Sequence, residues 1–405
     1  MVGALASHKE IHETRIDESR PDYPITRRLR SKLRVFVLHC SASWFTINMG
    51  TGVTSLLLYS LPYQFDVLEI ISKIFFALNL LLFVLFLLIS TVRYISWPQL
   101  FPAMLKHPVQ SLYLGTFSMG LTTLIDMCGL GFAPSDRGHP FALFVWAMWW
   151  INLAIALTIS IGLPILQSTR QKQTHDIISA VWILPIVADV VVASCGAIVA
   201  DILPPAHARL TITICYIVLG SGLGVIMLVY ALYYARLLFY KIPPSELIMS
   251  VFIPLGPCGQ GSYCILKLAD SMNNIVSETG RGFISNSMLT ADDSRIMALA
   301  LQSVSIPLAL LLWGFGLFWA VFAVIVVIDL WVVSELKFNI SWWGFSFAMG
   351  VFTLGTIEFG KQLGSDGFKI LGTVLTVMEV ILWLFLFFHT FYDTMRGRMC
   401  VCRRD

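Results

Sequence analysis

The feature that most constrains this chain is a succession of apolar segments separated by mostly short polar linkers. A membrane-spanning helix needs roughly 20 largely apolar residues, and each of these segments is long enough to supply one. Of the 405 residues 57% are hydrophobic and only 13% charged, whereas soluble domains are about 25% charged and cannot bury so much apolar surface. The sequence therefore predicts an all-α integral membrane protein. The predicted spans are residues 35–60, 67–92, 108–130, 141–166, 177–202, 209–239, 246–269, 296–333, 342–363 and 368–393.

Basic residues gather at the two ends of the chain, with eight Lys and Arg in the first 34 residues and four Arg after residue 395. Positive charge beside a span favours the cytosolic side, so we expect both termini in the cytosol and an even number of spans. The polar first 30 residues contain no apolar centre of a cleavable signal peptide. The expected organisation is a basic cytosolic tail, a ten-helix membrane domain and a second cytosolic tail, at residues 1–34, 35–395 and 396–405.

Two kinds of span alternate along the chain. The even-numbered spans are uniformly apolar, whereas the odd-numbered ones carry small and polar residues at mid-helix, as in WFTINMGTGVTS (44–55) and WWGFSFAMGVFTLGT (342–356). This is a weak repeat of about 70 residues, with a helical hairpin as its unit. Small and polar residues in a span permit close backbone approach or line a polar lumen. The pattern predicts five hairpins whose odd-numbered helices form a central five-helix pore; the alternative is that Gly and Ser merely allow tight packing.

Five collinear motifs in the odd-numbered spans resemble the tellurite-resistance/dicarboxylate transporter family, which includes plant slow-type anion channels, fungal malate permeases and fungal sulfite efflux pumps. The resemblance covers roughly residues 35–395, and its GPxGQGxY and MGTG patterns look most like the sulfite efflux branch. The motifs are WFTINMGTG, KHPVQSLYLGTFSMG (106–120), WILPIVADVVVASCG (182–196), GPCGQGSYCILKL (256–268) and FNISWWGFSFAMGVFTL (338–354).

The resemblance implies a homo-oligomer, usually a trimer with one pore in each protomer. It also implies a gate: a phenylalanine that plugs the pore within a Trp-Trp-x-aromatic-x-Phe-Pro setting, which corresponds to Phe347 here. A phenyl ring across a narrow lumen blocks hydrated ions and dewets the constriction. The chain departs from the family pattern at Ala348 and Ser118, where proline is common, and at Asp189, where a small residue or proline is common.

Polar and small residues of the odd-numbered spans are the candidate pore lining. Hydroxyl and amide groups can offer hydrogen bonds to an anion without the fixed charge that would trap it, and glycines keep a lumen wide. The alternative is that the glycines make helix contacts and the hydroxyls bond to the i−4 carbonyl. The candidates are Thr46, Asn48, Gly50, Thr51, Thr116, Ser118, Gly120, Asp189, Gly259, Gln260, Ser346, Gly350 and Thr353.

Ionisable residues at membrane depth are treated as functional hypotheses. Asp126, Asp189 and Asp201 lie in or at the ends of odd-numbered spans. A carboxylate at Asp189 would repel anions unless it is protonated or paired, so it could couple protons or tune selectivity; the alternative is a paired structural aspartate. Lys267 and Glu358 lie near span ends, where snorkelling or pairing accounts for them.

The expected function is efflux of sulfite, as hydrogensulfite, through a gated pore in the plasma membrane, the location that the resemblance implies. The alternative within the family is a proton-coupled malate or dicarboxylate transporter. A membrane-embedded enzyme is disfavoured, because the histidines lie in the N-terminal tail or near span ends and show no HExxH pattern. No GxxxxGK[ST] motif indicates transport driven by ATP. We expect no cofactor, no metal and no nucleic-acid partner; the partners are the anion and the lipid bilayer.

Overall fold

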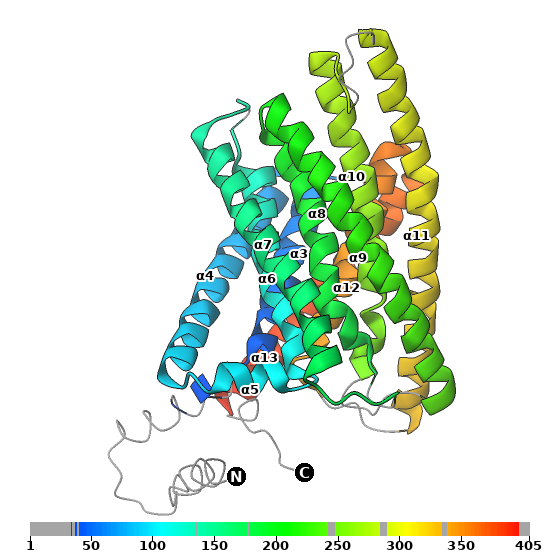
Figure 1. Cartoon of the computed structure of the whole chain (residues 1–405). Coiled ribbons are helices and arrows are strands. Elements are labelled where there is room, and N and C mark those ends of the chain that lie inside the picture. The colour runs from blue at the N-terminus through cyan, green and yellow to red at the C-terminus, as the bar shows by residue number, and fades with distance from the viewer. Residues whose placement is uncertain are drawn as a thin grey trace, which may run out of the picture.

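The computed structural model describes residues 34, 37–38, 40–134, 136–175, 178–241, 248–283, 290–333 and 338–396. Of the two predicted tails, only Arg34 and Arg396 belong to these residues, and the rest of both tails lies outside them. The regular elements of the described residues are all helices, which run roughly side by side (Figure 1).

Each predicted span contains one long helix. These are α3 (Phe45–Ser60), α4 (Asp66–Ser96), α6 (Leu114–Met127), α7 (Pro140–Thr169), α8 (Leu184–Ile202), α9 (Pro205–Tyr240), α10 (Leu255–Thr279), α11 (Ala291–Val333), α12 (Trp342–Gln362) and α13 (Asp366–Met395). Short 3-10 segments precede α3, α6, α8 and α10, namely η1 (Ala42–Trp44), η2 (Gln110–Tyr113), η5 (Ala180–Ile183) and η6 (Ile248–Phe252). These 3-10 segments were not predicted, nor were the helix α5 (Leu100–Lys106) and the π-helical segment η3 (Cys128–Phe132) that continues α6.

Six helices in the described residues are long and apolar enough to cross a membrane: α4, α7, α8 with η5, α9, α11 and α13. The chain is therefore a multi-pass membrane protein. The helices α3 and α6 have only 16 and 14 residues, and about 20 are needed to cross the hydrocarbon core alone. The predicted α-helical length is wrong there, because 3-10 and π segments replace part of the α-helix at their ends.

Local sequence signals explain several helix ends. Proline occupies the first position of α7 (Pro140) and of α9 (Pro205), where its missing N–H costs nothing. The imidazole of His139 accepts a hydrogen bond from the N–H of Phe141 and so caps α7. The helix α10 ends at Gly280, whose φ of 66° is the left-handed conformation that glycine adopts without strain. This glycine stops α10 ten residues beyond the predicted end of the seventh span.

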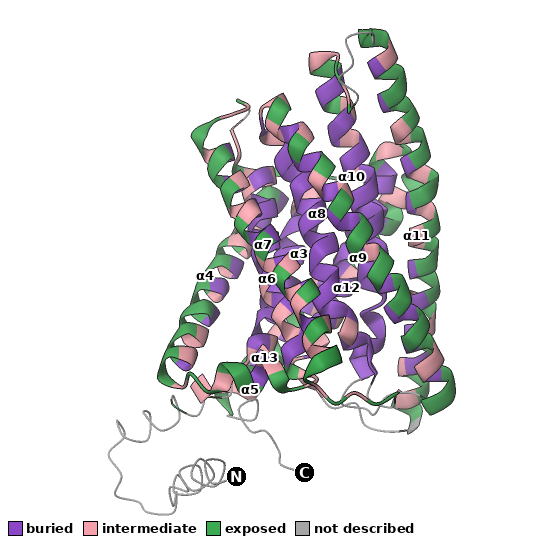
Figure 2. Ribbon diagram, in the orientation of Figure 1, coloured by how far each residue is buried: buried purple, intermediate pink, exposed green. Residues whose placement is uncertain are grey.

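The long helices form two layers. In the inner layer α3 packs against α6, α6 against α8, α8 against α10, α10 against α12, and α12 against α3, so the contacts close a ring. The outer helices α4, α7, α9, α11 and α13 each pack beside the inner helix that precedes them, with which they form a hairpin. Figure 2 shows the inner helices buried and the outer faces exposed. The apolar segment of η5–α8 is 100% buried, whereas that of α4 is 17% buried.

The inner helices run in one direction, because an outer helix returns the chain after each of them. The start of α3 lies beside the start of α12, where the Thr46 hydroxyl is 3.5 Å from the Ile340 carbonyl oxygen. The end of α13 lies at the same level, since the Trp343 indole donates to the Thr390 hydroxyl at 2.9 Å. All five inner helices therefore begin at one end of the ring, which we call the entry end.

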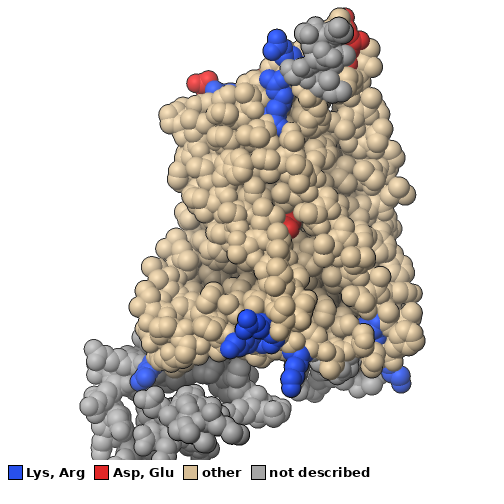
Figure 3. All heavy atoms as spheres, in the orientation of Figure 1, with Lys and Arg blue, Asp and Glu red and all other residues tan. Residues whose placement is uncertain are grey.

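Lipid-facing character belongs to the outer layer. Large apolar side chains such as Leu81, Ile217, Leu228 and Leu311 are 66%, 67%, 67% and 74% exposed. Charged side chains gather at the two ends of the molecule, and the broad band between them is almost entirely uncharged (Figure 3). This distribution is the one that a bilayer imposes, since hydrocarbon solvates apolar groups and excludes charges.

Candidate functional site

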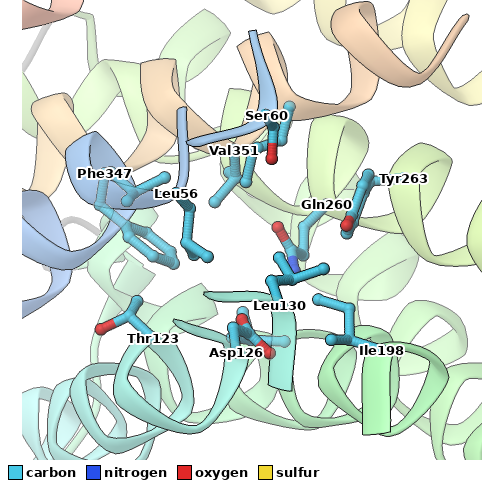
Figure 4. A pocket seen from close by; sticks show the side chains of 13 residues that line it. Leu56, Ser60, Thr123, Asp126, Leu130, Ile198, Gln260, Tyr263, Phe347 and Val351 are labelled. Atoms are coloured by element: carbon cyan, nitrogen blue, oxygen red, sulfur yellow. The ribbon is translucent and has the colours of Figure 1, made fainter. Parts of the chain in front are cut away.

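A narrow cavity lies inside the ring of inner helices. Every inner helix contributes to its wall, with η3 continuing α6, and among the described residues no outer helix does. Its lining is Val53, Leu56, Ser60, Thr123, Asp126, Leu130, Val191, Ile198, Gln260, Tyr263, Phe347, Val351 and Leu354. The close-up in Figure 4 shows these side chains converging from the surrounding helices on one space.

The spacing of the lining residues shows that one face of each helix meets the cavity. On α3 they are three and four residues apart (Val53, Leu56, Ser60), and on α12 four and three apart (Phe347, Val351, Leu354). Residues at these intervals lie on one side of an α-helix. The remaining faces of each inner helix are occupied by neighbouring helices.

The cavity is small and mostly apolar. Its volume is about 10 Å³, enough for roughly one water molecule. Phe347 projects into it from α12 and is itself 5% exposed. Ring pairs are formed by Trp343 and Phe352 on the same helix, whereas none of the ring pairs found in the described part of the chain includes Phe347. The cavity is therefore smaller than a hydrated anion.

Five residues with polar groups interrupt the apolar lining: Ser60, Thr123, Asp126, Gln260 and Tyr263. Asp126 on α6 and Gln260 on α10 are nearly buried, at 4% and 3% exposed. The Gln260 amide nitrogen donates to the Ser194 hydroxyl, which in turn donates to the Val191 carbonyl at 2.8 Å. The Oε1 atom of Gln260 and the Oδ1 atom of Asp126 have no hydrogen-bond partner. Both side chains point into the cavity (Figure 4). Their two unpartnered atoms are acceptors, and Ser60 and Tyr263 add hydroxyl groups to the same lining.

Of the thirteen candidate lining residues and the candidate gate, the structure brings Phe347 and Gln260 to the cavity wall. Several others bond to outer helices. Ser118 donates to Asn152 of α7 at 2.9 Å, Ser346 to Glu379 of α13 at 2.5 Å, and Asn48 to Asn79 of α4 at 3.1 Å. The Trp383 indole of α13 donates to Thr51 at 3.1 Å.

The other candidate hydroxyls bond to nearby backbone. Thr353 donates to the Met349 carbonyl at 2.8 Å, Thr46 to that of Ser43 at 2.6 Å, and Thr116 to that of Tyr113 at 2.7 Å. These are the local bonds that compete with any ligand for a threonine hydroxyl.

The candidate glycines lie where inner helices touch one another. A Cβ atom on Gly259 would be 2.3 Å from the Cα atom of Phe352, and one on Gly350 would be 2.5 Å from a Val53 methyl group. The position that a Cβ of Gly50 would take is 2.7 Å from the Trp343 indole. At Gly120 the nearest atom is the Cβ of Asn48, 3.1 Å away. These small residues set the close approach of the helices, as small residues do in membrane bundles.

Asp189 faces away from the cavity. It is 3% exposed, and its carboxyl group lies close to the Ser160 hydroxyl of α7. Its Cβ atom is also 3.2 Å from the position that a Cβ of Gly222 on α9 would take. Asp189 therefore lies where α8 meets the outer helices α7 and α9, and it is absent from the cavity lining.

A charged cluster lies at the end of the ring opposite the entry end. The Lys267 ammonium pairs with Asp201 at 2.9 Å and with Asp270 at 3.2 Å. Glu358 accepts from the Gln362 amide at 2.9 Å. The prediction that Lys267 pairs near a span end is confirmed, because its side chain reaches carboxylates on α8 and α10.

Sequence reasoning named Asp126 as a buried charge but did not assign it to the lining, and it missed the apolar wall. The signal that was available is the shared spacing: residues three to four and seven apart recur in α3, in α6 with η3, and in α12. That signal is weak by itself, since such intervals occur on every face of a fully buried helix.

The sequence of this chain is similar to those of known membrane proteins. Residues 39–391 match the SLAC1 family, described as voltage-dependent anion channels. The chain belongs to this family. The match covers the ring and its outer helices, so the family resemblance inferred from the five motifs is confirmed, and the family is one of membrane anion channels and transporters.

Individual relatives agree with this assignment. The chain is 37% identical over 352 residues to the sulfite efflux pump SSU1 of Arthroderma benhamiae, covering 87% of this chain and 90% of the relative. It is 27% identical over 378 residues to the Saccharomyces cerevisiae protein of the same name, with 82% of each covered. It is also 25% identical over 390 residues to the malic acid transport protein of Schizosaccharomyces pombe, covering 95% of this chain and 83% of that one.

Proposed function

We propose that this chain is a ten-span plasma-membrane channel that releases sulfite, as hydrogensulfite, from the cytosol through a pore inside the ring of inner helices, with Phe347 as the gate. The observation that carries the proposal is a cavity whose wall contains residues of all five inner helices and of no outer helix. A central lumen requires this arrangement, whereas gaps between packed hairpins would be lined by both layers.

The short inner helices fit this proposal. Non-helical backbone at membrane depth is tolerated where protein buries it or where it lines a lumen. The 3-10 segments η1, η2, η5 and η6 lie at the starts of inner helices that the outer layer surrounds. We therefore count α3, α6, α10 and α12 as spans, beside the six helices that qualify by length and composition.

The parallel direction of the inner helices supports entry of anions at the entry end. Each helix carries a partial positive charge at its N-terminus, equivalent to roughly half an elementary charge. The inner helices α3, α6, α8 and α12 receive no side-chain cap at their N-terminal residue. The dipoles of parallel helices add, so the potential at this mouth favours an anion without a fixed charge that would hold it.

The entry end also supports a cytosolic orientation. Its described loops and helix ends are rich in basic residues, as the positive-inside rule requires of the cytosolic side. With this orientation both termini are cytosolic, and a monovalent anion gains roughly 2.3 kcal/mol per 100 mV on leaving a negative interior. Efflux then needs no further energy source. The basic residues are Arg34, Arg93, Lys106, Arg170, Lys172, Arg236, Lys241 and Arg396.

Sulfite is preferred over malate for two reasons. The relatives of 37% identity carry the sulfite name, whereas the one named for malic acid is 25% identical. A larger divalent anion would also favour a cation in the lumen, and in the described residues the cavity lining includes no lysine or arginine. By its family we further propose a trimer in which each protomer contains its own pore.

Purified protein in liposomes tests the proposal. Anion flux is measured with sulfite, chloride, nitrate and malate, in the presence and absence of a proton gradient. Sulfite flux that follows the membrane potential and persists without a proton gradient is the expected result. Malate flux that tracks the proton gradient, without sulfite flux, would replace this proposal by the proton-coupled dicarboxylate transporter.

A further inference from the structure

The carboxyl group of Asp126 occupies an unusual position for a pathway that carries anions. It lines the cavity, is 4% exposed, and has one oxygen atom without any hydrogen-bond partner. Thr123 on the same helix lies against Gly52 of α3, and Ser346 lies against Gly50. Because the inner helices are parallel, these contacts with α3 allow the heights of Asp126 and Phe347 along the ring to be compared. Asp126 is about one helical turn, or roughly 5 Å, farther from the entry end than Phe347.

The titratable groups nearest Asp126 are weak acids. The Cys195 thiol of α8 donates a hydrogen bond to its carboxyl group. The Cys128 thiol lies at the end of α6, and the Tyr263 phenol of α10 lines the same cavity. None of these groups supplies a positive charge that would offset a carboxylate.

The other elements packed against α6 supply no cation either. The sequences of α3 and α7 contain no charged residue, and the one phenol of α3, Tyr59, donates to the Leu130 carbonyl at 2.7 Å. On α4 the Lys73 ammonium pairs with Glu69 at 2.6 Å. In the described residues, Asp126 takes part in none of the ion pairs, and Lys267 is held by two other carboxylates.

A carboxylate in this position opposes anions strongly. The cavity has room for only about one water molecule, so little solvent can screen a charge, and Oε1 of Gln260 in the same lining is another acceptor. The protonated carboxyl group is different, because its O–H is a donor. It would supply the centre of the cavity with a hydrogen-bond donor, beside the hydroxyl groups of Ser60 and Tyr263.

We propose that Asp126 is a proton-operated barrier in the pathway: its carboxylate stops anions, and its protonated form lets them pass by donating a hydrogen bond to them. The inference rests on the proposed function and deepens it, since Phe347 closes the pathway sterically and Asp126 closes it electrostatically. The substrate class is a monovalent oxyanion, which accepts a hydrogen bond from the carboxyl group as it passes.

The test is the pH dependence of flux through Asp126→Asn in liposomes, with equal pH on both sides. Nitrate is the first probe because its charge does not change with pH; for sulfite, the concentration of hydrogensulfite is held constant. Wild-type flux should fall about tenfold per pH unit once the carboxyl group ionises. Asp126→Asn, which is isosteric and always neutral, should give flux that stays constant over the same range.

Matched variants keep the result interpretable. Asp189→Asn removes a carboxyl group that is equally buried but lies outside the cavity, so its flux should follow the wild-type pH profile. Asp126→Glu retains the acid and should retain a pH dependence. A pH-dependent fall in Asp126→Asn as steep as in wild type, with flux present, would overturn the barrier and leave the channel standing. Absence of flux in wild type and Phe347→Ala alike would instead refute the proposed function.

Discussion

The polar residues of the inner helices fall into two groups with opposite surroundings. Those that face the outer helices, such as Ser118 and Ser346, have their hydrogen bonds made by α7 and α13. Those that face the cavity, Asp126 and Gln260, each keep an oxygen atom without a partner. The first group fastens the two layers together, and the second faces the cavity. A polar residue in an inner helix thus indicates a contact with the outer helices at least as often as a position at the cavity.

This comparison predicts that changes in the first group reduce stability and leave flux per folded molecule intact, except at Glu379, whose partner Ser346 adjoins the gate residue. Changes at the cavity should alter flux per folded molecule and leave stability intact. The same liposome assay and a thermal-unfolding measurement in detergent separate the two outcomes for every variant below.

The largest effect on folding is expected at Gly259. A methyl group there would lie 2.3 Å from the Phe352 Cα atom, so Gly259→Ala must push α10 and α12 apart. Overpacking of this kind costs about 3 kcal/mol or more. We expect little folded protein on size-exclusion chromatography. Gly344→Ala on α12, where nothing lies within 4 Å of the new methyl group, should elute as wild type; equal yields of the two would contradict the close packing of the ring.

A smaller loss of stability is expected at Asn152. Its side chain accepts from Ser118 at 2.9 Å and donates to Thr122 at 2.8 Å, at 0% exposure. Asn152→Leu leaves buried partners unpaired and should cost about 2 kcal/mol. Sulfite flux per folded molecule should be unchanged, because Asn152 does not reach the cavity. Thr158→Ala, an exposed threonine on the same helix, is the control and should change neither quantity. Altered flux in Asn152→Leu with normal stability would break the comparison.

Glu379 connects the layer contacts with the cavity, because its partner Ser346 directly precedes the gate residue Phe347. Glu379→Gln keeps an acceptor oxygen and should leave the melting temperature almost unchanged. Glu379→Leu removes the acceptor, which should cost about 1 kcal/mol and raise basal sulfite flux because the gate segment is less firmly held. Equal behaviour of the two variants would show that the 2.5 Å bond does not position α12.

The smallest effect is expected at Ser194. Ser194→Ala removes the acceptor of the Gln260 amide, whose N–H can then turn toward the cavity. A freed donor is worth about 0.5–1.5 kcal/mol, or roughly a two- to tenfold increase in flux. Ser262→Ala on α10, whose hydroxyl donates to the Ala309 carbonyl at 3.0 Å outside the cavity, is the matched control. No increase in Ser194→Ala would count against Gln260 as an anion contact.

The sequence was sufficient to predict the two layers but not the lining of the cavity. Outer helices are apolar throughout and inner ones carry Gly, Ser and Thr, and this contrast survives in the structure as exposed and buried helices. The sequence does not indicate which face of an inner helix meets the cavity, because every face is buried. The apolar segment of α8, for example, is 100% buried. Periodicity identifies a face only when one side differs from the others in its surroundings.

Two aspartates illustrate the limit. Asp126 and Asp189 both lie within inner helices, and their side chains are 4% and 3% exposed. The sequence pointed to Asp189, since it departs from the family pattern, yet that residue faces α7 and α9 and Asp126 faces the cavity. The rotation of each helix about its axis decides this, and it depends on contacts such as Gly259 against Phe352 that join residues far apart in the chain.

The most direct test of the account is sulfite flux through Phe347→Ala and Phe359→Ala in liposomes at matched protein density. Both residues are buried phenylalanines of α12, but Phe359 packs against Trp313 and Phe368 away from the cavity. The account predicts a large increase of flux in Phe347→Ala and none in Phe359→Ala. Equal flux in Phe347→Ala and wild type, with both proteins folded and conducting, would contradict a gated pathway inside the ring.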